Sequence, residues 1–259
     1  MRGKLLWTLV ISLTAAVCVA GLALAEKPTV VRAGNLVLKL NGDVKPAKLP
    51  KGKLAPITLF ASGNISTVDG SQPPVTKTIT IDFDKHGTVN AKGLPVCRSG
   101  ALQSRDTAAA KRACPTAIVG SGSTKVRVEF PEQAPFTASG PLVLFNGGVK
   151  GGVTTMFIHA YVNVPSPTAI VTIVKITKIR QGRYGTRAVA TIPKIAGGNG
   201  AVTDFNLKVQ RKFTYKGKRQ SYLLARCVGG RFFAHATTAF TDGTRISGTV
   251  IRSCVAQGG

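Results

Sequence analysis

Acidic side chains are scarce in this chain of 259 residues, which has 10 Asp and Glu against 35 Lys and Arg. Beyond Glu132 the acids are Asp204 and Asp242, and Asp242 belongs to a tight-turn sequence, Thr-Asp-Gly-Thr. A hydrolase that uses two carboxylates would therefore have to draw on the first half. No Gly-x-Ser-x-Gly segment is present, which excludes the nucleophile elbow of the α/β-hydrolases.

The spacings typical of structural zinc sites are also missing, because there is no Cys-x-x-Cys and no His stands beside a Cys. Four cysteines follow residue 25: Cys97, Cys114, Cys227 and Cys254. An even number in an exported chain favours two disulfides over zinc. We prefer the pairs Cys97–Cys114 and Cys227–Cys254, and the first would stabilise the fold by about 3 kcal/mol in the chain-entropy picture.

The second pair constrains the chain around it. In a flat three-strand meander Cys227 and Cys254 would lie about 9–10 Å apart, beyond the limit of about 7 Å between the Cα atoms of a disulfide. We therefore expect residues 228–233 to cross over, so that the strand of Cys227 lies beside the strand of Cys254.

The first 25 residues have the three parts of a secretory signal peptide. Arg2 and Lys4 precede an uncharged apolar stretch, and Ala23-Leu24-Ala25 supplies the small residues of a cleavage site. We expect cleavage after Ala25, secretion to the extracellular space, and a mature chain without a transmembrane segment. The alternative is an uncleaved anchor, because about 20 apolar residues can span a bilayer.

Period-2 alternation dominates the remaining sequence and predicts strands. In the clearest early example Ile79, Ile81 and Phe83 take one face and polar residues take the other, as in a sheet with one face on a core. The chain is therefore predicted to be all-β and antiparallel, either a β-sandwich or a strongly curved sheet. One short helix is expected at about 104–113, between Cys97 and Cys114, with Asp106 or Ser104 as its cap.

Residues 26–259 are expected to form a single β-rich extracellular domain, with a possible boundary between two domains near 146–152. The glycine-rich run at 147–152 is either a linker between domains or a wide hairpin turn. Apolar strands abut it on both sides without a polar spacer, which favours the hairpin.

Positive charge is concentrated late in the sequence. The formal charge of +25 becomes +23 without Arg2 and Lys4, and the segment 175–219 contains Asp204 as its single acid. Such a field attracts anionic cell-wall polymers or acidic polysaccharide, and its alternative is a solvated surface that keeps the protein soluble. Specific nucleic-acid recognition is not expected. The candidate polyanion contacts are Lys208, Lys212, Lys216, Lys218 and Arg219.

Asp82, Asp84 and His86 are the best candidates for a catalytic or metal-binding cluster, because on a continuous strand their side chains would share one face. However, residues 84–87 also fit a β-turn, with Asp first and Gly last, which would take His86 off that face. We therefore expect no catalytic constellation, no metal and no cofactor, and we expect the protein not to be an enzyme.

Several short motifs resemble those of a group of uncharacterised secreted proteins from high-GC Gram-positive soil bacteria. The likeness spans most of the mature chain, and it implies that the four cysteines and the loop between Cys227 and Phe233 belong to a shared scaffold. It implies no activity. The motifs are Leu94-Pro95-x-Cys97, Ala113-Cys114, Val119-Gly120-x-Gly122, Phe130-Pro131-Glu132-Gln133-x-Pro135-Phe136, Tyr184-Gly185-Thr186, Tyr215-Lys216-Gly217-Lys218-Arg219-x-Ser221-Tyr222-Leu223 and Arg252-Ser253-Cys254.

These features predict a secreted, disulfide-stabilised binding or structural module with a strongly basic surface that favours association with the cell surface. The alternative is a carrier that encloses an apolar ligand within a curved sheet, which a densely packed interior would exclude. A hydrolase built on Asp82, Asp84 and His86 is the least favoured hypothesis. The sequence leaves the ligand and the oligomeric state open.

Overall fold

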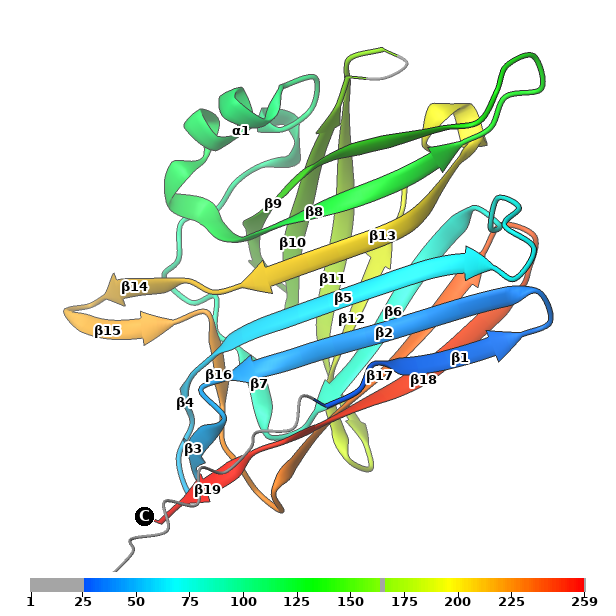
Figure 1. Cartoon of the computed structure of the whole chain (residues 1–259). Helices are drawn as coiled ribbons and strands as arrows, with labels where there is room; N and C mark the ends of the chain where they lie inside the picture. Colours follow the sequence, from blue (N-terminus) through cyan, green and yellow to red (C-terminus); the bar gives the residue numbers. More distant parts are fainter. Residues whose placement is uncertain (1–25, 164–165, 259) are drawn as a thin grey trace, which may run out of the picture.

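The structure, a computed structural model, describes residues 26–163 and 166–258, and its main feature is one antiparallel sheet of twelve strands (Figure 1). Every neighbouring pair in this sheet is antiparallel and hydrogen-bonded. In spatial order the strands are β1 (Thr29–Ala33), β2 (Leu36–Lys45), β5 (Thr58–Thr67), β13 (Gly200–Val209), β8 (Ile118–Val128), β9 (Phe136–Lys150), β10 (Val153–Val162), β11 (Thr168–Gln181), β12 (Tyr184–Thr191), β6 (Thr76–Asp84), β17 (Arg231–Phe240) and β18 (Arg245–Ser253).

The sheet curls so strongly that its two edges meet, with β18 lying beside β1 and β2 (Figure 1). Glycines permit this curvature where the backbone or an aromatic ring comes too close for a Cβ atom. A Cβ on Gly63 would overlap the Phe205 ring, and a Cβ on Gly122 would overlap the carbonyl oxygen of Asn206. The prediction of an all-β chain is confirmed, and of its two variants the strongly curved sheet is the one formed.

Short strands cover one end of the curled sheet. They make a three-stranded sheet, a parallel pair and a hairpin that projects from the molecule (Figure 1). The three-stranded sheet consists of β4 (Ala55–Pro56), β16 (Leu223–Ala225) and β7 (Gly87–Val89). The parallel pair is β3 (Lys48–Pro50) with β19 (Val255–Gln257), and the hairpin is β14 (Lys212–Tyr215) with β15 (Lys218–Ser221).

A short helix, α1 (Thr107–Ala113), packs on β9 and β10 outside the sheet. The Asp106 carboxylate caps it by accepting a hydrogen bond of 2.7 Å from the backbone N–H of Ala109. The predicted disulfide between Cys97 and Cys114 flanks the helix, with a Cα–Cα distance of 5.6 Å. The predicted helix and its flanking disulfide are therefore confirmed. Three 3-10 turns, at Ser99–Ala101, Pro115–Ala117 and Ala196–Gly198, complete the helical elements of the described residues.

The second predicted disulfide, Cys227–Cys254, is also present, with a Cα–Cα distance of 5.9 Å. The expected crossover at 228–233 is wrong. After β16 the chain leaves the three-stranded sheet, turns at Gly229 and Gly230, which both have positive φ, and then enters β17. Cys227 reaches Cys254 because it lies beside β3, donating its N–H to the carbonyl of Pro50, rather than in a strand next to β18.

The glycine-rich run at 147–152 joins two neighbouring strands. Residues up to Lys150 belong to β9, and Gly151 and Gly152, both at positive φ, turn the chain into β10. The hairpin prediction is therefore confirmed over the linker. Among the described residues, no helix has the length and apolar character needed to cross a membrane. The predicted signal peptide at 1–25 lies outside the described residues.

Candidate functional site

The interior of the curled sheet contains a cavity of about 280 Å³. Inward-facing apolar side chains from all around the sheet line it. One from each of six strands suffices to show this: Leu59 (β5), Val126 (β8), Ile158 (β10), Val174 (β11), Ala188 (β12) and Ile81 (β6). The alternation predicted for β6 is confirmed, because Ile79, Ile81 and Phe83 all face this cavity.

A cavity of this size is unusual inside a folded protein. Protein interiors are normally close-packed, with few voids larger than a water molecule. A space of about 280 Å³ far exceeds such voids, so an apolar ligand that enters it would bury its own surface against the wall.

The polar groups of the cavity wall are few and mostly uncharged. Thr124, Thr172 and Thr186 contribute hydroxyls to the middle of the wall. The charged lining residues, Asp43, Asp84 and Arg252, come from the strand ends at one end of the cavity. Because burying an unpaired charge is far more costly than burying a hydroxyl, the wall suits an uncharged ligand with an apolar body.

Apolar side chains pack at both ends of the cavity. At one end, Ile195 and Val202 pack with Val126 and Val128 in an apolar cluster. At the other end, Tyr222 and Leu223 belong to the apolar cluster between the sheet and the short strands. Tyr222 is 1% exposed, and burial raises the pKa of its hydroxyl, so the phenol remains neutral at physiological pH.

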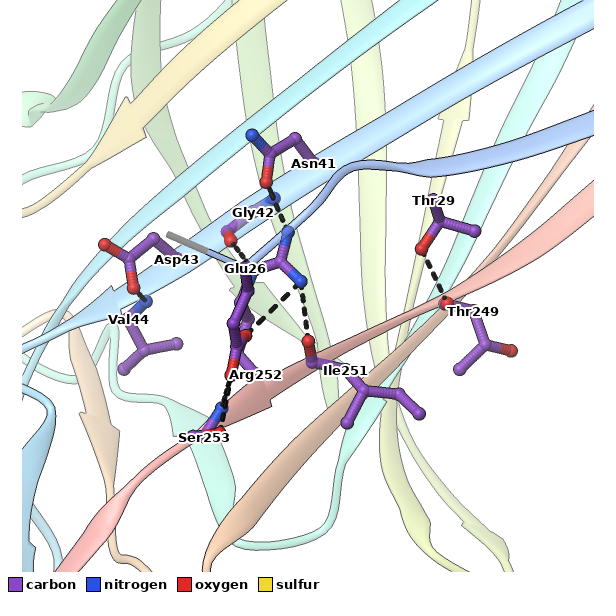
Figure 2. Close-up of polar contacts among 10 residues, drawn as sticks. All are labelled: Glu26, Thr29, Asn41, Gly42, Asp43, Val44, Thr249, Ile251, Arg252 and Ser253. Atoms are coloured by element: carbon purple, nitrogen blue, oxygen red, sulfur yellow. Dashed lines mark hydrogen bonds and ion pairs between the residues drawn. The ribbon is translucent and has the colours of Figure 1, made fainter. Parts of the chain in front are cut away.

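The lateral wall differs where the sheet edges meet. Among the described residues no ladder hydrogen bond joins β18 to β1 or β2. Side chains bridge the gap instead. Thr29 Oγ1 donates a 3.0 Å hydrogen bond to the carbonyl of Thr249, and Arg252 donates to the carbonyl of Gly42 and to Oδ1 of Asn41 (Figure 2). We call this joint, formed by residues 26–44 facing residues 245–253, the seam.

Arg252 is the central residue of the seam. Its side chain is only 11% exposed, it lines the cavity, and its Nη1 lies 3.4 Å from a carboxylate oxygen of Glu26. The other Glu26 oxygen accepts hydrogen bonds from the backbone N–H and the hydroxyl of Ser253 (Figure 2). Partial burial raises the pKa of Glu26, but the Ser253 hydrogen bonds and the Arg252 charge outweigh it, so the pKa lies below its ordinary value.

The seam and the ladder-paired joints between neighbouring strands differ in strength. A side-chain hydrogen bond contributes about 0.5–1.5 kcal/mol net, or about 1.5–3 kcal/mol when one partner is charged. The few bridges at Arg252 and Thr29 therefore hold the seam by a few kcal/mol. A ladder joint such as β10–β11 is paired along its whole length, from Thr154 opposite Ile176 to Val162 opposite Thr168. The seam is therefore the weakest lateral joint of the cavity wall.

The polar cluster considered from the sequence is only partly assembled. Asp84 and His86 come together: Asp84 accepts the backbone N–H of His86 at 2.9 Å, and its Oδ1 lies 2.7 Å from His86 Nδ1. Asp82 instead forms a two-point ion pair with Arg187, at 2.6 and 2.8 Å. The predicted turn at 84–87 is present. Within residues 26–163 and 166–258, no three His, Cys, Asp or Glu side chains are placed to hold a metal ion.

The candidate polyanion contacts are all exposed, and the structure distributes them between one strand and one hairpin. Lys208 lies on β13, with its ammonium group 5.8 Å from the centre of the Phe60 ring. The others belong to the projecting β14–β15 hairpin, and none of the five forms an ion pair with a described residue. Tyr215 packs over Gly93 and is therefore not a free stacking surface. The hairpin cations are Lys212, Lys216, Lys218 and Arg219.

The seam was not found from the sequence, although one signal was present. In β18, Ile246, Gly248 and Val250 occupy the inward positions, and the same period places Arg252 inward as well. A cation at an inward position of an alternating strand indicates a special partner. Its acidic partner, Glu26, is 226 residues away and could not be identified by spacing.

Comparison with known proteins adds no further information, because no family model, curated protein or solved structure matches this chain.

Proposed function

We propose that this protein is an extracellular carrier that binds a small, uncharged, apolar molecule inside its curled sheet. The observation that carries this proposal is the cavity of about 280 Å³ in the centre of the fold. An engineered apolar cavity of about 150 Å³ accepts benzene, so this one has room for a ligand of roughly a dozen non-hydrogen atoms.

The chemistry of the wall supports the same ligand class. Its apolar side chains favour a hydrocarbon body through burial of apolar surface, and Thr172 and Thr186 allow one hydroxyl or carbonyl group on the ligand. Asp43 and Asp84 disfavour a carboxylate at the charged end, because like charges repel and the charge of Arg252 is already paired with Glu26. The two disulfides agree with a protein that works in an oxidising, extracellular compartment.

The experiment is a fluorescence titration with 1-aminonaphthalene, a neutral apolar fluorophore of suitable size, followed by displacement with alkanols of increasing chain length. The wild-type protein should bind the fluorophore in a saturable manner, and displacement should weaken once the alkanol outgrows the cavity. Failure to bind either the fluorophore or the alkanols would contradict the proposal.

A filled cavity should abolish binding. Ala188 faces the cavity from β12, and Ala188→Phe should block the ligand while stabilising the protein by about 0.5–2 kcal/mol, as cavity-filling substitutions commonly do. Ala169, the neighbour of the cavity-lining Ile170 on β11, faces the opposite side of the sheet, so Ala169→Phe is the matched control and should bind normally.

A second proposed role is electrostatic attachment to anionic wall polymers through Lys208 and the β14–β15 hairpin. The exposure of these cations, none of them paired within the described residues, favours it and is compatible with a carrier held near the cell. Washing cells with high salt should release the protein, since screening weakens exposed charge interactions. A protein that is already free in low-salt medium would contradict this attachment.

A further inference from the structure

The seam faces directly into the cavity. Gly42 and Val44 on β2, and Val250 and Arg252 on β18, belong to the seam and line the cavity at the same time. No other lateral part of the wall combines these properties within the described residues, because every other neighbouring pair of the twelve strands carries ladder hydrogen bonds.

The weak part of the seam is short, because both of its ends are fixed. On one side, Leu36, Leu38 and Leu40 of β2 pack in a buried cluster that includes Ile246 of β18. On the other side, the Cys227–Cys254 disulfide and the parallel pairing of β19 with β3 hold the chain. Between these fixed points, residues 41–44 face residues 250–253. We call this segment the window.

The window is bridged mainly by one side chain. Arg252 reaches across it to the carbonyl of Gly42 and to Asn41 (Figure 2). Glu26 pairs with the guanidinium and is itself held by hydrogen bonds from Ser253. When the hydrogen bonds of Arg252 to Gly42 and Asn41 break, water can take the place of the lost partners. Opening either end of the cavity would instead expose apolar clusters around Ile195 or Tyr222.

We infer that the ligand enters and leaves the cavity sideways through the window between β2 and β18, and that Arg252 is the side chain that keeps this window shut. This inference rests on the proposed carrier function. The window is the route by which the ligand exchanges, and Arg252 controls the rate of this exchange rather than the affinity for the ligand.

The test is a reversible lock. A Cβ atom on Gly42 would lie 4.0 Å from Cγ1 of Val250, the position that Sγ of a cysteine at 250 would take, so Gly42→Cys with Val250→Cys brings two cysteines close enough to be joined across the window after a small shift of the strands. Stopped-flow exchange of 1-aminonaphthalene should be at least about tenfold slower in the oxidised double variant than after mild reduction. Wild-type protein under the same reductant controls for the native disulfides. An unchanged exchange rate in the locked form would overturn the inference.

A second variant keeps the inference testable if the lock disturbs folding. Arg252→Ala should speed both association and dissociation by about fivefold, the factor that corresponds to roughly one lost interaction. Lys45→Ala is the matched control, because Lys45 is an exposed cation at the end of β2 whose partner, Asp43, is on its own side of the seam. Equal rates in wild type and Arg252→Ala would contradict the inference.

The two proposals fail in different ways. If the carrier proposal is wrong, the wild-type protein shows no saturable binding and no exchange can be measured. If the window is wrong, binding is normal but neither the lock nor Arg252→Ala changes the rates. Should Arg252→Ala lower affinity without changing the dissociation rate, its side chain contacts the ligand and the inferred role is also wrong.

Discussion

Two walls of the same cavity are held together in different ways. The wall made of β9, β10 and β11 is a continuous ladder, covered on its outside by α1 and the Cys97–Cys114 disulfide. The wall made of β18 and β2 is a contact between two sheet edges, bridged by Arg252, Glu26 and Thr29. Exposed sheet edges are prone to unwanted pairing, and here each edge shields the other without a full set of ladder bonds. The comparison shows how one sheet can supply both a rigid support and a joint that opens.

The largest expected effect is on the ladder wall. Phe145 lies on β9, is fully buried, and packs under α1 outside the cavity. Phe145→Ala should lower the free energy of unfolding by about 3–5 kcal/mol, because it leaves a large unfilled space in a well-packed cluster. Urea denaturation measures this loss. Ile251→Ala at the seam, where the side chain is 42% exposed, is the comparison and should cost well under 1 kcal/mol. Similar losses at both sites would contradict the contrast between the walls.

Loss of either disulfide should lower stability, but loss of only one should also change the rate of ligand exchange. Removal of either one, by a double Cys→Ala substitution, should cost about 2–4 kcal/mol, since their sequence separations of 17 and 27 are similar. Only the loss of Cys227–Cys254, which fixes one end of the window, should also speed exchange of 1-aminonaphthalene. Thermal denaturation and stopped-flow fluorescence on the same two variants test this. Faster exchange after loss of Cys97–Cys114 would show that general loosening, rather than the window, sets the rate.

The sequence predicts the ladder wall much better than the seam. Alternation at Ile79, Ile81 and Phe83 identified inward positions, and the cap at Asp106 identified α1, because these patterns depend on neighbours close in the chain. The helix begins at Thr107, and Ser104, at a positive φ of 57°, lies before it. The curvature depends on contacts such as Phe205 over Gly63, between strands far apart in sequence, so composition alone could not choose a curled sheet over a sandwich.

The two incorrect expectations about strands also come from contacts between distant parts of the chain. Alternation alone joins Phe205 to Tyr215 in one strand, but β13 ends at Val209 and β14 begins at Lys212, because the hairpin leaves the curled sheet at that point. The crossover after Cys227 was inferred by assuming that the strand before it stays in the main sheet. β16 instead pairs with β4 and β7, which brings Cys227 to Cys254 by another path. Local alternation cannot report which sheet a short strand joins.

The smallest expected effect is a pH dependence of the seam that comes from Glu26. Its carboxylate holds Ser253 and Arg252, and Arg231 adds a more distant positive charge, so its pKa in the folded protein is below the ordinary 4.5. A carboxyl group with a lowered folded pKa stabilises the native state above its unfolded pKa and loses this contribution as the pH falls through the folded value. At neutral pH the seam therefore has its full strength, and below pH 4.5 it weakens progressively.

Exchange of 1-aminonaphthalene should accordingly be constant from neutral pH down to about 4.5 and become faster below it. Because the fluorophore itself becomes protonated in acid, a neutral alkanol detected by calorimetry is the better ligand at the lowest pH. Glu26→Gln keeps the shape of the side chain but carries no charge, so it should exchange slightly faster at neutral pH and show no further acceleration in acid. If Glu26→Gln follows the wild-type profile, another carboxyl group controls the window, and Asp43, beside it on β2, is the first to exchange for Asn.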